Sequence, residues 1–512
     1  MGEGRTIARN VASNLGGYVA AIIVSLVMAP FIVHSLGESA YGIWVLIASI
    51  SGYYGLLDFG IRSALLIQIT QAWAAGDDAL LNRRVSTAMG VLSVIATVAV
   101  AGTLFLAWQL IGLFTIPPEM LESARKAIVI LGFGIAISVP FDVFTLIPTA
   151  IQRVDVSTAL NVGGRVIGAL GMYYALSRGY GFVGIAVAQT VASFASWIAG
   201  VFVTVRLLPK LKVRPSFFDR TAVKSLVQQG LHLFLGRFSG VIIDWSDALV
   251  VGIVMHEPRA ISRYVFGNNL VPYFTATVTS VGTSLGAHAV AWQTKGESDK
   301  VRSLLTDGIR WVGAFAALGA GGLWFTGPDF LRIWLGTSVL EGGGLPSSYT
   351  IMMILTGAAL ARSSMVCARE IFIARGEASV LSRLGIAEAV ANIALSVVLG
   401  HAYGLIGVAF GSLIPAIVIR LFWGPALVLE RLKVPVMVYV VRLVRGPAVI
   451  LPAMAGAAWL VKRAMPIDSV VPLLILITAA GLSGVIAAFF AALDGGERAK
   501  IIEKAQNAIG RS

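Results

Sequence analysis

The sequence predicts an all-α polytopic membrane protein with about fourteen transmembrane helices. Of its 512 residues, 57% are hydrophobic and only 13% are charged, whereas a soluble globular chain carries roughly 25% charged residues. Apolar stretches of about 20 residues recur along the whole chain, and each can cross a hydrocarbon core of about 30 Å as a helix. We therefore expect no soluble domain. We attribute the net charge of +13 to basic loops between spans, not to nucleic-acid binding.

Apolar windows separated by charged or Gly/Pro-rich stretches are the predicted spans. They cover approximately residues 12–34, 42–68, 87–114, 127–151, 160–177, 182–205, 226–255, 264–291, 309–335, 349–374, 384–401, 405–429, 446–464 and 470–493. The first window is longer than the apolar region of a signal peptide, so we expect it to remain as the first span.

The positions of lysine and arginine predict how the chain is oriented. Of the 39 cations, 27 fall in the termini and alternate connections that share one side, seven fall on the other side, and five arginines lie in or at the edges of spans. Cytoplasmic loops are the ones enriched in Lys and Arg. The sequence therefore predicts a multi-pass membrane protein with both termini in the cytoplasm.

Two pairs of similar segments indicate an internal repeat. GYGFVGIAVAQ at 179–189 resembles AYGLIGVAFGS at 402–412, and GDDALLNRR at 76–84 corresponds to GESDKVRSL at 296–304. Duplication of a six-helix unit would place two lobes in the same orientation, with a binding site between them. Independent occurrence of small-residue packing patterns is the alternative. The predicted domains are an N-lobe at 1–206, a cytoplasmic linker at 207–225, a C-lobe at 226–430, and two further spans with a cytoplasmic tail at 431–512.

Charged residues inside spans are the main indication of function, because a charge at membrane depth normally faces water or a partner. In the second span, Asp58 and Arg62 lie one helical turn apart and could pair. One interpretation is structural: the pairing lowers the cost of placing both charges in the membrane. The other is functional: Arg62 binds an anionic headgroup, while Asp58 orients Arg62 or takes up a coupling cation. In the seventh span, Arg237, Asp244 and Asp247 lie on adjoining stripes, and the surplus acid could bind H⁺ or Na⁺.

Arg362 and Arg420 lie deep in their spans, with no acid three or four residues away on the same helix. Their partners must come from another helix, from water or from a substrate. The planar guanidinium matches phosphate oxygens. The predicted anion contacts are therefore Arg62, Arg237, Arg362 and Arg420. Arg332, close to Asp329, is expected to reach the interface instead.

Further acidic residues have predicted roles. Asp142 follows Pro140 in the fourth span, where a kink would form either a gate or only a bent helix. The candidates for cation coupling are thus Asp58, Asp142, Asp244 and Asp247. Glu388, near the start of a span, is expected to pair in a cytoplasmic loop, as is Glu370 with Arg369.

Several classes of function lack their sequence signature. The chain has no GxxxxGK[ST] phosphate-binding loop, no Cys/His cluster with metal spacing, and no large loop to hold a glycosyltransferase or polymerase site. The single cysteine, Cys367, lies inside a span and is expected to be a packing residue. The sequence therefore predicts a secondary transporter that is not an enzyme and binds no metal or cofactor. Transport would be coupled to an ion gradient, of H⁺ or Na⁺, or to the membrane potential.

Residues 5–61 resemble the start of Wzx-type polysaccharide flippases of the multidrug/oligosaccharidyl-lipid/polysaccharide (MOP) exporter superfamily. The most specific elements are LGESAYGIW at 36–44 and LLDFGI at 56–61, and the later GYGFVGIA and AYGLIGVA segments fit the same family. The resemblance implies two six-helix lobes (MATE/MOP-like) around a central cavity, two additional C-terminal helices, and alternating access to the two sides.

The resemblance also implies the cargo and partners. Family members move undecaprenyl-pyrophosphate-linked oligosaccharide, such as an O-antigen (lipopolysaccharide) or exopolysaccharide repeat unit, from the cytoplasmic to the periplasmic leaflet. A polysaccharide polymerase and a chain-length regulator would be partners, besides membrane lipids, and nucleic acid would not. The alternatives are a multidrug or organic-cation antiporter, which Asp244 and Asp247 keep open, and a lipid II flippase. Lipid II flippases usually carry arginines in the first span, and this chain has none between Arg9 and Arg62.

Overall fold

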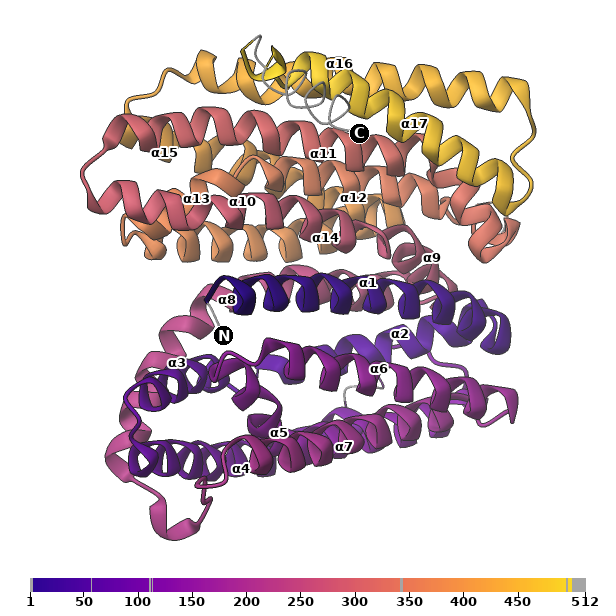
Figure 1. The fold of residues 1–512 in the computed structure, drawn as a ribbon. Coiled ribbons are helices and arrows are strands. Elements are labelled where there is room, and N and C mark those ends of the chain that lie inside the picture. Colours follow the sequence, from indigo (N-terminus) through magenta and orange to yellow (C-terminus); the bar gives the residue numbers. More distant parts are fainter. Residues whose placement is uncertain are drawn as a thin grey trace, which may run out of the picture. The chain divides into compact units, whose positions relative to one another are not determined.

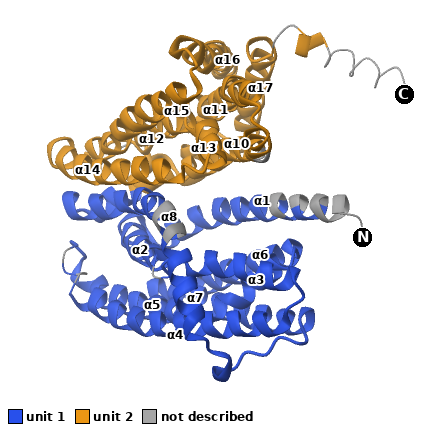
Figure 2. Ribbon diagram, turned by 90° about the vertical axis from the view of Figure 1, so that its left-hand side faces the viewer, with its two compact units in different colours: residues 1–262 blue, residues 263–512 orange. Residues whose placement is uncertain are grey.

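A computed structural model describes the backbone of residues 3–56, 58–109, 112, 114–340, 344–493 and 496–499. Within these ranges the chain is helical and contains no strand. It divides into two compact units, residues 1–262 and 263–512 (Figure 2).

In unit 1, long helices run side by side (Figure 1). The elements are α1 (Glu3–Leu36), α2 (Glu38–Gly52), η1 (Tyr53–Leu56), α3 (Ile61–Ala74), α4 (Asp78–Trp108), α5 (Pro118–Ala150), α6 (Val154–Ser177), α7 (Gly181–Leu207), η3 (Pro215–Phe217) and α8 (Arg220–Met255). Apolar side chains of α3, α4 and α5, among them Leu65, Leu92 and Ile147, form its main core. The short helix α9 (Pro258–Asn268) contains the boundary between the units.

Unit 2 combines two helices of 38 residues with shorter, interrupted ones. They are α10 (Val271–Thr294), α11 (Ser298–Leu335), η4 (Thr337–Val339), α12 (Ser348–Ser363), α13 (Val366–Ala374), α14 (Ala378–Pro415), the π-helical η5 (Ala416–Trp423), α15 (Gly424–Leu432), α16 (Val436–Ala464) and α17 (Val470–Ala491). Its core joins α11 to α16 and α17, with Ile450 and Leu476 fully buried.

The helical, multi-span fold predicted from hydropathy is confirmed. All fourteen predicted windows overlap helices. By length and composition, nine helices among the described residues could each cross a membrane, or ten if the bent pair formed by α2–η1 and α3 is one span. One of these candidates, Ala378–Leu432, contains two of the predicted windows. Fourteen spans are therefore compatible with the structure, and the predicted lobe boundaries at 206, 225 and 430 remain predictions.

The similar segments of the predicted repeat have the same backbone turn. Gly181 (φ 53°) begins α7, and Gly404 (φ 63°, ψ −142°) divides α14 into two helices at the corresponding place. Both residues adopt left-handed φ values, which glycine tolerates without a steric cost. This shared turn agrees with duplication of a six-helix unit.

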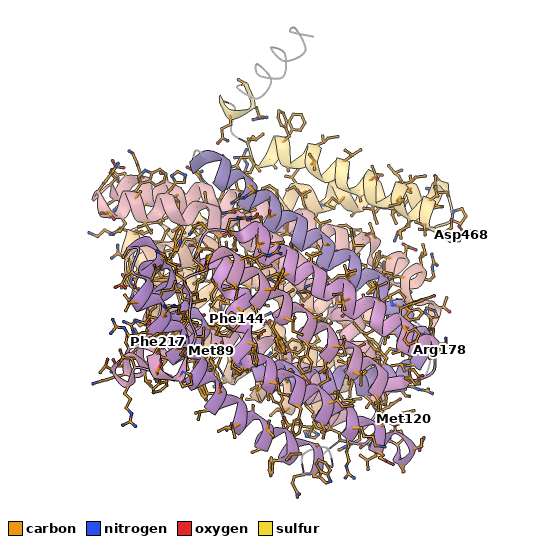
Figure 3. The ribbon with its side chains drawn as sticks, turned by 60° about the horizontal axis from the view of Figure 1, so that its bottom comes forward. Met89, Met120, Phe144, Arg178, Phe217 and Asp468 are labelled. Carbon is orange, nitrogen blue, oxygen red and sulfur yellow. The ribbon has the colours of Figure 1, made fainter. Side chains whose placement is uncertain are left out.

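The two ends of unit 1 are formed by different sets of connections. Met120 at the start of α5 and Arg178 after α6 lie toward one end, whereas Phe217 and Met89 lie toward the other (Figure 3). At this second end the predicted linker is held on α4. The backbone N–H of Lys212 donates to Asn82 (2.8 Å), and that of Asp219 donates to Thr87 (3.0 Å).

Candidate anion-binding site

In unit 2 the regular α-helical backbone is interrupted at two places, and these two places are in contact. Helix α12 stops at Ser363, and α13 resumes at Val366 after a turn, while Arg420 lies in the π-helical segment η5. The Ser364 hydroxyl donates to the carbonyl of Arg420 (2.6 Å), and Tyr439 of α16 donates to the carbonyl of Ser364 (2.7 Å). Irregular backbone at membrane depth needs such partners, and π-helical turns are frequent at functional sites.

At this junction two arginines share one carboxylate. Arg362 donates from Nε to Oε1 of Glu388 (2.7 Å), and Arg420 donates from Nε to Oε2 (2.5 Å). The Glu388 side chain is 1% exposed, whereas those of Arg362 and Arg420 are 27% and 19% exposed. The carboxylate is therefore enclosed, while both arginine side chains are partly exposed. When all three are ionised, the cluster carries a net charge of +1.

The structure corrects the role expected of Glu388. Sequence analysis placed it in cytoplasmic loop pairing, but it is a buried counter-ion inside α14. As expected, the partner of Arg362 and Arg420 comes from another helix; this acid lies 26 and 32 residues away in the sequence. A signal was present nonetheless. Glu388, Asn392 and Ser396 recur every four residues in an apolar helix, which predicts a buried polar stripe.

The second predicted span is not a continuous helix, which corrects the expected pairing of Asp58 with Arg62. Phe59 (φ 45°) and Gly60 (φ 75°) are left-handed, and α2–η1 and α3 are bent by 46°. Asp58 accepts a hydrogen bond from the N–H of Gly60 (2.9 Å). Arg62 instead pairs with Asp142 of α5 at 3.1 Å, with side chains 37% and 27% exposed. Helix α5 continues without a break through Pro140.

The charges of the seventh predicted span lie on α8. The Arg237 side chain lies outside the described part of the structure, so its predicted role stays a prediction. Asp244 is exposed and Asp247 is buried, so the two acids differ in environment. Between them, Trp245 packs on Gly52 of α2, where an added Cβ would lie 2.7 Å from the indole.

The remaining sequence predictions concern ion pairs of unit 2, its buried cysteine, and metal binding. Arg332 pairs with Asp329 (2.9 Å), which also contacts Lys462 (2.7 Å). Arg369 pairs with Glu370 (2.7 Å), and Cys367 is fully buried. The described residues contain no group of three or more His, Cys, Asp or Glu side chains placed to hold a metal.

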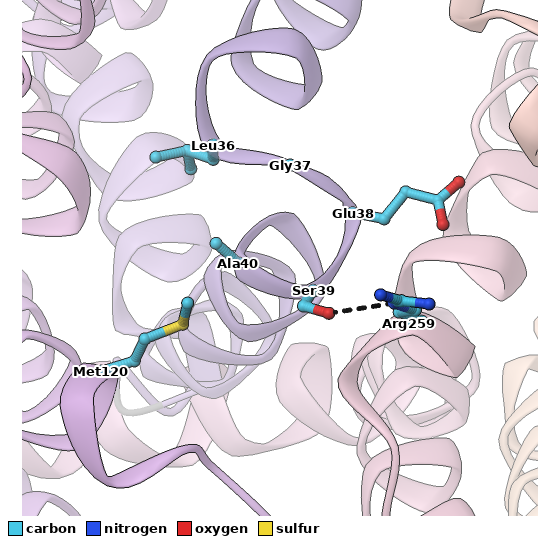
Figure 4. A pocket seen from close by; sticks show the side chains of 7 residues that line it. All are labelled: Leu36, Gly37, Glu38, Ser39, Ala40, Met120 and Arg259. Atoms are coloured by element: carbon cyan, nitrogen blue, oxygen red, sulfur yellow. Dashed lines mark hydrogen bonds between the residues drawn. The ribbon is translucent and has the colours of Figure 1, made fainter.

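The motif LGESAYGIW forms one wall of a cavity in unit 1. The cavity has a volume of about 380 Å³ and is lined by residues 36–40, Met120 and Arg259 (Figure 4). Arg259 donates from Nε to the Ser39 hydroxyl (3.3 Å). Gly42 lies against the carbonyl of Pro258, and a Cβ there would come within 1.9 Å of that oxygen. The glycine of the motif therefore permits close packing of α2 on the start of α9.

Comparisons with known proteins agree with the sequence resemblance. The family model described as "Polysaccharide biosynthesis protein" matches residues 7–285, more than half of the chain. The chain is similar to the membrane protein EpsK of Bacillus subtilis, with 23% identity over 64% of this chain and 65% of EpsK, just under two thirds of that protein. It is also similar to the probable flippase AglR of Haloferax volcanii, with 21% identity over 80% of each chain.

Solved structures share the fold. The lipid II flippase MurJ in an inward closed conformation covers 94% of this chain and 98% of its own length, with a TM-score of 0.69 and 15% identity. An inward-facing multidrug resistance MATE transporter of the MOP superfamily covers 80% of this chain and 98% of its own, with a TM-score of 0.60 and 16% identity. The predicted MOP-type fold is confirmed. AglR, MurJ and the MATE protein are named as flippases or transporters, in agreement with the expectation that the chain is not an enzyme.

Proposed function

Because the chain belongs to the polysaccharide biosynthesis protein family, we propose that this multi-pass membrane protein is a flippase for undecaprenyl-pyrophosphate-linked oligosaccharide. Its cargo would be an O-antigen or exopolysaccharide repeat unit, moved from the cytoplasmic to the periplasmic leaflet of the inner membrane by alternating access. Both termini would face the cytoplasm. A polysaccharide polymerase and a chain-length regulator would take up the product, and nucleic acid would have no part.

The observation that carries the proposal is the cluster of Arg362, Arg420 and Glu388. Two arginine side chains in predicted spans are partly exposed and both donate to a single enclosed carboxylate. Charged side chains at membrane depth normally face a partner, water or a substrate. Guanidinium groups bind phosphate through paired hydrogen bonds. We therefore assign the pyrophosphate to Arg362 and Arg420, and retain Arg62 and Arg237 as further candidate contacts.

The acids of unit 1 are the proposed coupling site. Arg62 pairs with Asp142, and Asp58 is also buried close to this pair. One base facing two acids leaves a surplus carboxylate that could bind H⁺ or Na⁺. Asp244 and Asp247 on α8 are the alternative coupling acids.

A multidrug or organic-cation antiporter is the second candidate function, and the acidic pair Asp244 and Asp247 favours it. In such a protein these aspartates would be essential and the arginines of unit 2 dispensable. A lipid II flippase is a third candidate function for this fold, and its arginines would also bind a pyrophosphate. A comparison of lipid II with an oligosaccharide carrier as cargo would separate it from the proposed function.

The test is translocation in proteoliposomes loaded with undecaprenyl-pyrophosphate-linked oligosaccharide in one leaflet, with arrival in the other detected by a lectin. We expect Arg362→Ala and Arg420→Ala to slow translocation by about tenfold or more, because a hydrogen bond to a charged group contributes about 1.5–3 kcal/mol. Arg62→Ala should have a smaller effect, since this side chain is 37% exposed and has its own acid. Runs with a pH, sodium or voltage gradient would identify the coupling ion.

Arg178→Ala is the matched control, because this exposed arginine follows α6 in a connection. It should leave the rate within about twofold, the scale of a neutral surface change. Equal amounts of folded protein must be reconstituted for every variant. Normal translocation by both Arg362→Ala and Arg420→Ala would refute the proposed function.

A further inference from the structure

Glu388 bridges Arg362 and Arg420, at the place where an anionic cargo would have to bind these two arginines. Its two oxygens accept one hydrogen bond from each guanidinium, at 2.7 and 2.5 Å, as two oxygens of a phosphate would. Glu388 belongs to a buried polar stripe of α14, on which Asn392 donates to Ser412 (2.8 Å) and Ser396 is fully buried. The side chains of the two arginines are partly exposed, whereas that of the acid is 1% exposed.

The charge balance makes the acid and a diphosphate competitors. With Glu388 engaged, a diphosphate diester would meet a net charge of +1 and the like charge of the carboxylate. With Glu388 disengaged, the hydrogen bonds that both arginines donate to this acid would be available to the cargo. Resting on the proposed function, we propose that Glu388 is a resident counter-ion, displaced from Arg362 and Arg420 by the diphosphate as it binds and restored as it leaves.

Such competition suits a transporter. A site that only passes its cargo must bind strongly enough to load and weakly enough to release. A resident anion lowers the apparent affinity by the fraction of time that it occupies the arginines. It also preserves their geometry between cargoes, because both guanidinium groups then stay paired with an acid.

Exchange of partners would also loosen contacts between helices. Arg362 lies in the last turn of α12, Arg420 in η5, and Glu388 in α14. Their ion pairs join the three segments only while the acid is engaged. Displacement of Glu388 therefore gives cargo binding a direct route to the packing of α14.

The experiment compares the wild-type chain with Glu388→Gln in nanodiscs of neutral lipid. The probes are geranylgeranyl pyrophosphate, inorganic pyrophosphate and the uncharged geranylgeraniol. The substitution keeps the size of the side chain and removes its charge. We expect the Kd of both pyrophosphate probes to fall by about tenfold or more, with no change for geranylgeraniol and slower turnover of loaded cargo.

Glu370→Gln is the matched control, because Glu370 is a buried glutamate of unit 2 that pairs with Arg369 at 2.7 Å. It should leave pyrophosphate affinity unchanged. Glu388→Asp provides a second variant should Glu388→Gln not fold. Its shorter carboxylate would hold the arginines less well, so pyrophosphate affinity should rise while translocation continues.

The outcomes separate this inference from the proposed function. A folded Glu388→Gln or Glu388→Asp protein that binds pyrophosphate no better than wild type overturns the inference and indicates a purely structural acid. If the wild type binds geranylgeranyl pyrophosphate no better than geranylgeraniol, and Arg420→Ala changes nothing, the anion site of the proposed function is itself refuted.

Discussion

Corresponding places in the two units contain different chemistry. The similar segments align Gly181 with Gly404, a shift of 223 positions. By this shift Arg420 corresponds to Trp197, which stacks on Phe141 with ring centroids 4.5 Å apart and planes 20° apart. Glu388 corresponds to the exposed Arg165. Unit 1 thus has an aromatic stack where unit 2 has an ion cluster.

The units also differ in the sign of their surplus charge. Near Arg62 in unit 1, one base faces two acids, and its pair with Asp142 has both side chains more than a quarter exposed. In unit 2, two bases share an acid that is 1% exposed. The proposed anion site thus lies in unit 2, and the proposed coupling acids lie in unit 1. Three pairs of substitutions test this comparison.

The largest expected difference is in stability. Glu388→Ala removes an enclosed acid from between two arginines, and loss of one partner from a buried ion cluster costs about 3–5 kcal/mol. Asp142→Ala removes a partner from a pair whose side chains are more exposed, at 37% and 27%, and should therefore cost less than Glu388→Ala, about 1 kcal/mol. Thermal unfolding of the purified variants in one detergent would measure both. Equal losses would show that the two charge sites are alike.

The sequence predicts the positions of the helices better than it predicts which side chains of different helices pair with each other. Hydropathy locates spans because each must bury about 20 apolar residues. The ion pairs of Arg362 and Arg420 join residues 26 and 32 positions apart, a separation that no helical periodicity encodes. The four-residue spacing of Glu388, Asn392 and Ser396 identifies a buried face, but it does not reveal which cations meet it.

The second span shows where helical spacing fails. Asp58 and Arg62 have the spacing of a helical ion pair, yet Gly60 between them is left-handed and the helix is interrupted. The glycine in LLDFGI was the available signal, since a glycine inside an apolar span often marks a break. With the helix interrupted, Asp58 bonds the backbone of Gly60 and Arg62 reaches Asp142 on α5.

A smaller effect is expected where the units make the same turn with different residues. Gln152 (φ 63°) joins α5 to α6, whereas Gly376 (φ 72°) joins α13 to α14. A left-handed conformation costs a non-glycine residue about 1–2 kcal/mol. Gln152→Gly should therefore stabilise the protein, by up to about 1 kcal/mol after the added entropy of the unfolded chain is subtracted.

The reverse change is Gly376→Ala, which should destabilise the protein by about 1 kcal/mol. An added Cβ at Gly376 would meet no atom within 4 Å, so the effect reports backbone conformation alone. Melting temperatures of the two variants should move in opposite directions. A shift of the same sign in both would show that the turns are not equivalent.

The smallest effect concerns a feature that both units share. At these turns, Arg153 donates to Asp155 (3.1 Å) and Arg375 donates to Glu377 (2.8 Å). A second arginine approaches each acid, Arg9 in unit 1 and Arg431 in unit 2. The hydrogen bonds from Arg153 and Arg375 are the main reason that the pKa of each carboxyl is lowered.

A lowered native pKa stabilises the fold fully above the unfolded pKa of about 4 and progressively less as the pH falls through the native value. Asp155→Asn and Glu377→Gln should each flatten the loss of stability between about pH 5 and 3. Because both acids are solvent-screened, each effect should stay below about 1 kcal/mol. Melting curves of the wild type and these two variants across this pH range would measure the change in stability. A flattening in only one variant would show that this turn, like the charge sites, differs between the units.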